Sequence, residues 1–186
     1  MLMLRIIGGK YKGRLLEAPT GKSTRPTTNR VREALFSIID SKYKLVGARV
    51  LDACAGSGAL GLEAISRGAD HSTFFDINKN ALEIIKKNII NLNEELSTDI
   101  YQADITNPPK PKNGVPCSFV FLDAPYQSKI PIEGLNAISK SGWLHQSSIV
   151  IIETKKDTNF PWPNIFREIE LRIYSSTKLH FIEYIG

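Results

Sequence analysis

The sequence has few cysteines and no long apolar run. Two cysteines among 186 residues do not make a disulfide framework, so we expect a reducing compartment. The longest aliphatic run is Ile149–Ile152, whereas a membrane-spanning helix needs about 18 such residues. The apolar residues Met1–Leu4 are followed at once by Arg5, which leaves no signal-peptide core. The three histidines lack the spacing of metal ligands, and we expect a soluble cytoplasmic protein without a metal.

Basic residues are concentrated in the first 50 positions. This segment has eleven lysines and arginines against three acidic residues, a net charge of +8, while the remaining residues carry −3. A basic end on a weakly acidic body indicates either a surface for a polyanion or a merely solvated face. An aromatic ring among basic residues could also stack on a base. The candidate nucleic-acid contacts are Arg5, Lys10, Tyr11, Lys12, Arg14, Arg25, Arg30 and Arg32.

The length suits a single domain, 1–186, with a basic hairpin and helix at 1–45 and a core at 46–186. Short apolar runs alternate with helical patterns in the core, which is typical of a doubly wound α/β fold with strands buried on both faces. The basic segment Ile6–Leu15, with three glycines, predicts a hairpin. Strands are expected at Ala48–Leu51, Thr73–Phe75, Ile100–Ala103, Phe119–Leu122, Ile149–Ile152, Arg167–Tyr174 and Leu179–Ile185, and helices at Arg30–Ser41, Ala59–Arg67, Lys79–Asn93 and Pro131–Ser139.

A glycine-rich segment follows the first core strand and precedes a helix. Gly56, Gly58 and Gly61 let a ligand approach the backbone there, at a helix N-terminus with unpaired N–H groups. They also fit the G-x-G-x-x-G pattern of dinucleotide sites, which leaves a nicotinamide oxidoreductase as a distant alternative. Asp52, at the end of the preceding strand, argues against a pyrophosphate, because a carboxylate repels it and attracts an ammonium group.

Two more acidic residues end the next two expected strands. Asp76 lies 18 residues after Gly58, where a carboxylate can accept both hydroxyls of a ribose. Asp104 could accept a hydrogen bond from an adenine amino group. Acids at three successive strand ends therefore describe a ligand with an amine, a ribose and an adenine, and without a phosphate. The alternative is that each acid only caps the helix that follows it.

The residues Asp123-Ala124-Pro125-Tyr126 follow the next core strand. Together with the glycine loop they resemble the catalytic motif of S-adenosylmethionine-dependent methyltransferases that modify exocyclic amines. Two N-terminal stretches, Arg5–Arg14 and Arg25–Phe36, are similar to those of the bacterial methyltransferases that modify guanine N2 in 16S ribosomal RNA. The resemblance spans nearly the whole chain. It departs from the family pattern at Ala124, which replaces a proline, and at Asp76, which replaces the usual glutamate.

The resemblance implies a Rossmann-like class I methyltransferase fold, with a mostly parallel seven-stranded sheet, helices on both faces and an N-terminal β-hairpin. It also implies the methyl donor S-adenosyl-L-methionine, the product S-adenosyl-L-homocysteine and no metal. The donor would be bound by Asp52, Ala53, Gly56, Gly58, Asp76, Ile77, Asp104 and Asp123. The catalytic residues would be Asp123, Ala124, Pro125 and Tyr126.

The expected partner is 16S ribosomal RNA or a precursor of the small ribosomal subunit, bound by a monomer without a membrane. Two alternatives stay open besides the oxidoreductase. An adenine-N6 DNA methyltransferase would use the same chemistry and the same basic segment. A non-catalytic RNA-binding assembly factor would have lost the activity of its motif at Ala124.

Overall fold

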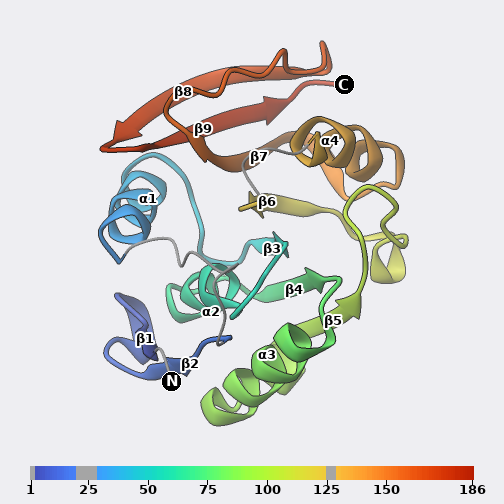
Figure 1. The fold of residues 1–186 in the computed structure, drawn as a ribbon. Coiled ribbons are helices and arrows are strands. Elements are labelled where there is room, and N and C mark those ends of the chain that lie inside the picture. Colours follow the sequence, from blue (N-terminus) through green and yellow to red (C-terminus); the bar gives the residue numbers. More distant parts are fainter. Residues whose placement is uncertain (1–2, 20–28, 125–128) are drawn as a thin grey trace.

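The computed structural model describes residues 3–19, 29–124 and 129–186 (Figure 1). The predictions for Arg25, Pro125 and Tyr126 lie outside these ranges. The strands are β1 (Met3–Arg5), β2 (Leu15–Glu17), β3 (Arg49–Ala53), β4 (His71–Asp76), β5 (Thr98–Gln102), β6 (Cys117–Leu122), β7 (Leu144–Lys155), β8 (Phe166–Tyr174) and β9 (Thr177–Tyr184). The helices are α1 (Asn29–Lys42), α2 (Ala59–Ser66), α3 (Lys79–Leu92) and α4 (Ile130–Lys140), with 3-10 turns η1 (Gly9–Tyr11), η2 (Glu95–Ser97) and η3 (Lys112–Gly114).

Within the described ranges, seven strands form one sheet in the order β5-β4-β3-β6-β7-β9-β8. The neighbours from β5 to β7 are parallel, whereas β9 runs antiparallel to β7 and β8. This arrangement confirms the predicted mostly parallel, seven-stranded sheet. The strand order reverses its direction between β3 and β6, and α/β sheets bind ligands at the carboxyl ends of strands beside such a reversal.

Helices cover both faces of the sheet, with α1, α2 and α3 on one side and α4 on the other (Figure 1). Phe36 of α1 packs against Phe121 of β6 in the first core, at 5.6 Å between ring centroids. In the second core, Leu135 of α4 packs in one cluster with Val120 of β6. Successive strand residues are buried on opposite faces, which explains their continuous apolar runs. None of the helices in the described ranges is both long and apolar enough to cross a membrane.

The sequence of helix α3 explains which face packs on the core, where the helix begins and where it ends. Its apolar stripe at three- and four-residue spacing packs toward the core, where Ile85 and Ile89 are buried. The side chain of Asn78 caps the helix by accepting a hydrogen bond from the Asn80 N–H at 2.9 Å. The helix ends where Asn93 takes the left-handed conformation, with φ of 58°. The predicted helix over Lys79–Asn93 is confirmed to within one residue.

The N-terminal hairpin exists, but its predicted strands were placed too far inward. The paired strands are β1 and β2, and the connecting segment 6–14 contains the 3-10 turn η1. Gly9 and Gly13 have positive φ angles of 75° and 88°, which suit tight turns and would interrupt a strand. The glycines that suggested a hairpin therefore form its long connection.

Candidate active site

Four carboxylates gather around Cys54 at the carboxyl edge of the sheet. In the spatial order of the strands, Asp104 follows β5, Asp76 ends β4, Asp52 lies near the end of β3 and Asp123 follows β6. Burial raises the pKa of the Cys54 thiol to about 12, and the negative charges of all four acids add to this effect. The thiol therefore stays protonated and is a poor nucleophile. The acids that end successive strands in the sequence therefore lie at one edge of the sheet.

Asp52 is the most deeply buried of these acids, with 2% of its surface exposed. Its pKa is raised to about 8, chiefly by burial; a hydrogen bond from the Gly61 N–H opposes this shift, and the charges of Asp123 and Asp76 contribute to it. The bond to Gly61 is 2.9 Å long and satisfies a free N–H in the first turn of α2, as the capping alternative requires. A cationic ligand group beside this carboxyl would favour its ionised form.

Asp76 holds the glycine loop from the neighbouring strand. Its Oδ2 accepts from the Gly56 N–H at 2.9 Å, and its Oδ1 accepts from the Asn78 N–H at 2.8 Å. The cap of α3 is the side chain of Asn78, so the capping alternative does not explain Asp76. Each carboxylate oxygen has a second lone pair, and Asp76 can therefore accept hydroxyl groups as well.

The glycines of the loop serve different purposes. Gly56 has a φ of 57°, and a Cβ added there would meet open space, which leaves room for a ligand at the backbone. Gly58 is the N-cap of α2 with a φ of 76°. A Cβ on Gly61 would lie 2.4 Å from the side chains of Phe74 and Ser72, so this glycine lets α2 pack closely on β4. The loop combines a ligand-accessible backbone with a tightly seated helix.

The remaining predicted ligand residues lie at the same edge. Ile77 directly follows β4 and is 69% exposed, an apolar side chain offered to solvent beside Asp76. Asp104 is exposed and accepts from the N–H and hydroxyl of Thr106. Ala124 is buried and packs in the same core cluster as Ala53, the last residue of β3. No group of three or more His, Cys, Asp or Glu residues in the described part of the chain is arranged to hold a metal ion.

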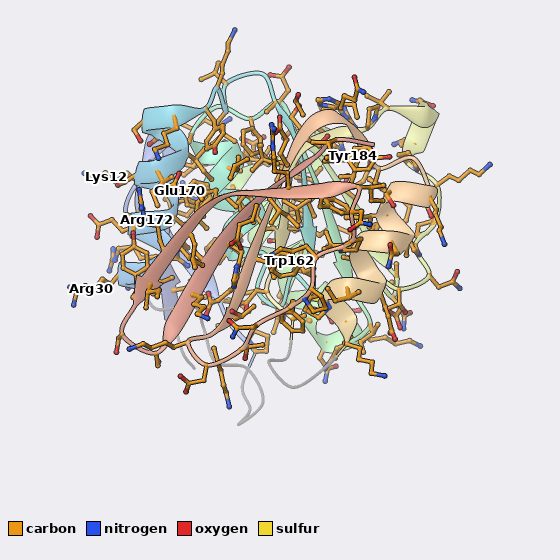
Figure 2. The ribbon with its side chains drawn as sticks, turned by 90° about the horizontal axis from the view of Figure 1, so that it is seen from above. Lys12, Arg30, Trp162, Glu170, Arg172 and Tyr184 are labelled. Carbon is orange, nitrogen blue, oxygen red and sulfur yellow. The ribbon has the colours of Figure 1, made fainter. Side chains whose placement is uncertain are left out.

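The predicted nucleic-acid residues differ in their exposure and in whether their side chains already contact other parts of the chain. Lys12 and Arg30 are exposed and lie toward the same side of the molecule in Figure 2. Arg14 is hydrogen-bonded to the Asn91 carbonyl at 2.5 Å. Arg5 is also exposed and donates to the Gly13 carbonyl. Lys10 and Tyr11 are both engaged by Glu94, which forms an ion pair with the lysine and accepts from the phenol at 2.5 Å.

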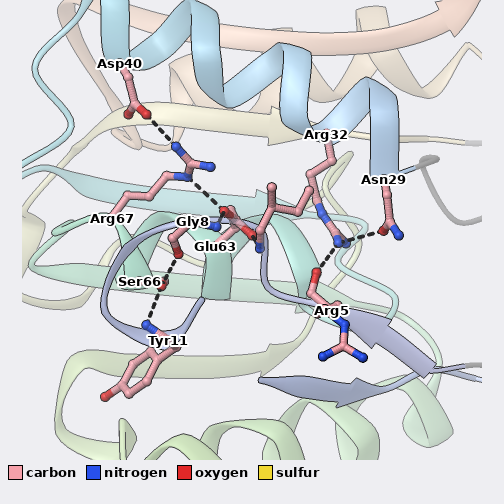
Figure 3. A network of polar contacts seen from close by, with 10 residues as sticks. Arg5, Gly8, Tyr11, Asn29, Arg32, Asp40, Glu63, Ser66 and Arg67 are labelled. Carbon is pink, nitrogen blue, oxygen red and sulfur yellow. Dashed lines mark hydrogen bonds and ion pairs between the residues drawn. The ribbon is translucent and has the colours of Figure 1, made fainter. Parts of the chain in front are cut away.

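Arg32 does not have the accessible position that a nucleic-acid contact needs, and that prediction is wrong. The residue is 1% exposed, and its guanidinium donates to the Arg5 carbonyl and to Asn29 Oδ1 (Figure 3). Burial lowers its pKa, and the negative charge of Glu63 raises it. Counting charges along the sequence could not separate this arginine from exposed ones. It fastens α1 to β1 instead.

Glu63 is a structural residue that sequence reasoning missed. It is fully buried in α2, and its carboxylate accepts from the N–H groups of Ile7 at 2.7 Å and Gly8 at 2.8 Å (Figure 3). Arg67 donates from Nε to the same carboxylate at 2.8 Å and also pairs with Asp40 of α1. The sequence signal for this structural role was an acidic residue between apolar residues of a buried helix. This network ties the N-terminal connection to two helices.

Ser66 completes the attachment one turn later. Its hydroxyl accepts from the Tyr11 N–H at 2.9 Å and donates to the Gly8 carbonyl at 2.5 Å. A Cβ on Gly9 would lie 1.8 Å from the Ser66 carbonyl oxygen, so only glycine fits there. Helix α2 thus carries the glycine loop at its start and the basic connection at its end.

Comparisons with known proteins agree with this architecture. A family described as conserved hypothetical protein 95 matches residues 4–183. Ribosomal RNA small subunit methyltransferase D of Escherichia coli strain K12 is 34% identical over 158 residues, covering 85% of this chain and 78% of that protein. The protein of the same name from Buchnera aphidicola of Acyrthosiphon pisum is 37% identical over 151 residues, covering 81% of this chain and 78% of its own length. The solved structure of the Escherichia coli protein yhhF has a TM-score of 0.82 at 28% identity, with 98% of both chains covered. The chain therefore belongs to the family of conserved hypothetical protein 95, together with the ribosomal RNA small subunit methyltransferases D.

Proposed function

We propose that this protein transfers a methyl group from S-adenosyl-L-methionine to the exocyclic N2 amine of a guanine in 16S ribosomal RNA. The observation that carries the proposal is the row of four carboxylates, which ends at Asp123 and the adjoining Ala124, in a chain of this family. The donor has a sulfonium and an ammonium cation and no phosphate. An acidic edge attracts such a molecule and repels a dinucleotide.

Each donor group finds a suitable residue at this edge. Asp52 would bind the ammonium, Asp76 the ribose hydroxyls and Asp104 the adenine amino group, while Ile77 would pack against the adenine ring. The open backbone at Gly56 leaves space for the amino-acid part of the donor. When bound, the donor supplies the electrophilic methyl group on its sulfonium. The other donor contacts would be Ala53, Gly58 and Asp123.

Asp123 and Ala124 would prepare the acceptor. An exocyclic amine is a poor nucleophile because its lone pair is delocalised into the ring. The Asp123 carboxylate and the Ala124 carbonyl would accept its two hydrogens, turning the lone pair toward the methyl group, and Asp123 would then take the released proton. Pro125 favours an extended conformation at residue 124, and Tyr126 would stack on a base that has left its helix.

The exposed basic residues near the N-terminus would bind the RNA backbone. Lys12, Arg14 and Arg30 extend from a connection and a helix that the Glu63 network holds in place. A backbone that is already held in place loses little entropy on binding, which favours affinity. Arg5, Lys10, Tyr11 and Arg25 complete the proposed surface, and Arg32 is excluded because it is buried. The substrate would be free 16S RNA or a small-subunit precursor bound by a monomer.

The test is methyl transfer from tritiated donor to 16S RNA, to small ribosomal subunits and to duplex DNA. The product nucleoside is then identified by mass spectrometry, and Asp123→Ala is the inactive control. N2-methylguanosine in the RNA is the expected result. N6-methyladenine in the DNA would support the adenine methyltransferase instead. Tight RNA binding without transfer to any of these substrates would identify an assembly factor.

A further inference from the structure

A hollow of about 310 Å³ lies where β7 ends and the β8–β9 turn begins, outside the site described above. It is lined by Lys155, Lys156 and Asp157 from the end of β7 and by Ser175 and Ser176 from the turn. Two ammonium groups and two hydroxyl groups are hydrogen-bond donors to an oxyanion. The lining therefore has the chemistry of a phosphate site, with one acidic residue opposing it.

The backbone around this hollow is held in place before any ligand arrives. The Lys156 N–H donates to the Ser176 carbonyl at 2.9 Å, joining the two segments. The Thr158 N–H donates to the Lys155 carbonyl at 3.0 Å, closing the turn after β7. The largely buried Lys178 of β9 donates from Nζ to the Thr158 carbonyl at 3.1 Å and to Asn159 Oδ1 at 2.9 Å. A preformed site of this kind loses little entropy on binding.

The strand register places the hollow at the same edge of the sheet as the catalytic motif. Leu122 of β6 pairs with Ile152 of β7, so Asp123 and the end of β7 lie on the same side. Lys155 pairs with Thr177 at the start of β9, which brings the turn to this edge as well. With about 3.3 Å per residue and 4.8 Å between strands, this register places the backbone of Lys155 roughly 8 Å from that of Asp123. This is within reach of nucleotides next to a bound target base.

The edge becomes less acidic beyond β6. The ends of β5, β4, β3 and β6 carry acids, which suit the cationic donor and repel the phosphates of RNA. The next strand, β7, has Glu153 near its end, but its last residue is Lys155 and Lys156 follows directly. We propose that this hollow binds a backbone phosphate of the RNA beside the target nucleotide, on the opposite side of the catalytic motif from the donor. The inference rests on the proposed function and adds a second RNA contact to the basic N-terminal segment.

The test compares two exposed lysines at opposite edges of the sheet. Lys156→Gln removes one cation from the hollow, and the matched control Lys140→Gln removes one at the end of α4, which precedes β7 at the amino edge. Affinity for 16S RNA is measured between 50 and 300 mM salt. Lys156→Gln should weaken binding about two- to fivefold, the range of an exposed ion pair. Its salt slope should be smaller in magnitude by about 0.7, with Lys140→Gln unchanged and Lys156→Arg close to wild type.

Asp157→Asn is expected to have the opposite effect on RNA binding. Removing this carboxylate from the lining should strengthen RNA binding and leave the affinity for S-adenosyl-L-methionine unchanged. If Lys156→Gln and Lys140→Gln behave alike while the wild type methylates RNA, the hollow is not a phosphate site and the proposed function stands. Weaker binding to assembled subunits but not to naked RNA would assign the hollow to a protein and overturn the inference. A wild type that neither binds nor methylates RNA would overturn both proposals.

Discussion

Replacing Asp52 by asparagine should stabilise the protein at neutral and alkaline pH. The pKa of Asp52 is raised from 3.8 to about 8, chiefly by burial. The folded protein therefore holds a proton that the unfolded chain releases above pH 3.8, so the free energy of unfolding falls as the pH rises from about 4 to 8. At 1.36 kcal/mol per pH unit this contribution amounts to about 5 kcal/mol by pH 8. The carboxamide oxygen of the Asp52→Asn variant could still accept the Gly61 N–H, which keeps the loop in place.

The assay is urea unfolding of the wild type and of Asp52→Asn at pH 5, 6, 7 and 8. The difference between them should be about 1.6 kcal/mol at pH 5 and grow by close to 1.4 kcal/mol per pH unit, to about 5 kcal/mol at pH 8. Asp70→Asn is the matched control, because Asp70 is an exposed aspartate. An equal pH slope for the wild type and Asp52→Asn would refute the reasoning, since Asp52 would then ionise as it does in the unfolded chain.

The same substitution should have the opposite effect on the donor. A bound ammonium needs the ionised carboxylate, so donor affinity should fall nearly tenfold for each pH unit below 8. Asp52→Asn should lose this dependence and bind more weakly by about 1.5–3 kcal/mol, as expected for a lost hydrogen bond to a charged group. Calorimetry with S-adenosyl-L-methionine measures both effects. Unchanged affinity in the variant would remove Asp52 from the donor site.

Three further predictions concern the acceptor, the RNA and the fold. At saturating methyl donor, Asp123→Asn should slow single-turnover transfer to guanine about 5- to 150-fold, because its amide N–H group would face a hydrogen-bond donor on the base edge; a wild-type rate would show that Asp123 does not contact that edge. Lys12→Gln combined with Arg14→Gln should reduce the salt slope of RNA binding by about 1.4 in magnitude, and an unchanged slope would make the segment a solvated surface. Glu63→Gln should lower the free energy of unfolding by about 3–5 kcal/mol, since it breaks a buried charge network, and a loss below about 1 kcal/mol in urea unfolding would contradict this.

The sequence predicts the core of the fold well because its strands and helices have strong local patterns. Apolar runs ending in an acid locate β3, β4 and β6, and their shared edge follows from parallel pairing alone. Local sequence patterns do not predict where β7 begins and ends. The strand spans Leu144–Lys155, far beyond the apolar run, because its C-terminal flank pairs with β9 and Leu144 pairs with Cys117 of β6. Pairing partners distant in sequence decide its length.

Side-chain roles depend on contacts that no local pattern encodes. Arg32 and Arg30 are two residues apart on one helix, yet one is buried against β1 and the other is exposed. The partners of Glu63 are backbone N–H groups 55 and 56 residues away. Such contacts appear only once the N-terminal connection is placed on α2, which the sequence alone does not do.

The strand order also determines when the chain can fold during synthesis. β3 lies between β4 and β6 in the sheet, and β6 is made about 70 residues later, as the pairing of Val50 with Phe119 shows. Tyr11 meets Glu94 across 83 residues. Long-range pairings of this kind slow folding to about milliseconds to seconds, because the intervening loop must close first. The basic segment 1–50, with its charge of +8, is therefore synthesised well before the residues that it contacts in the folded protein.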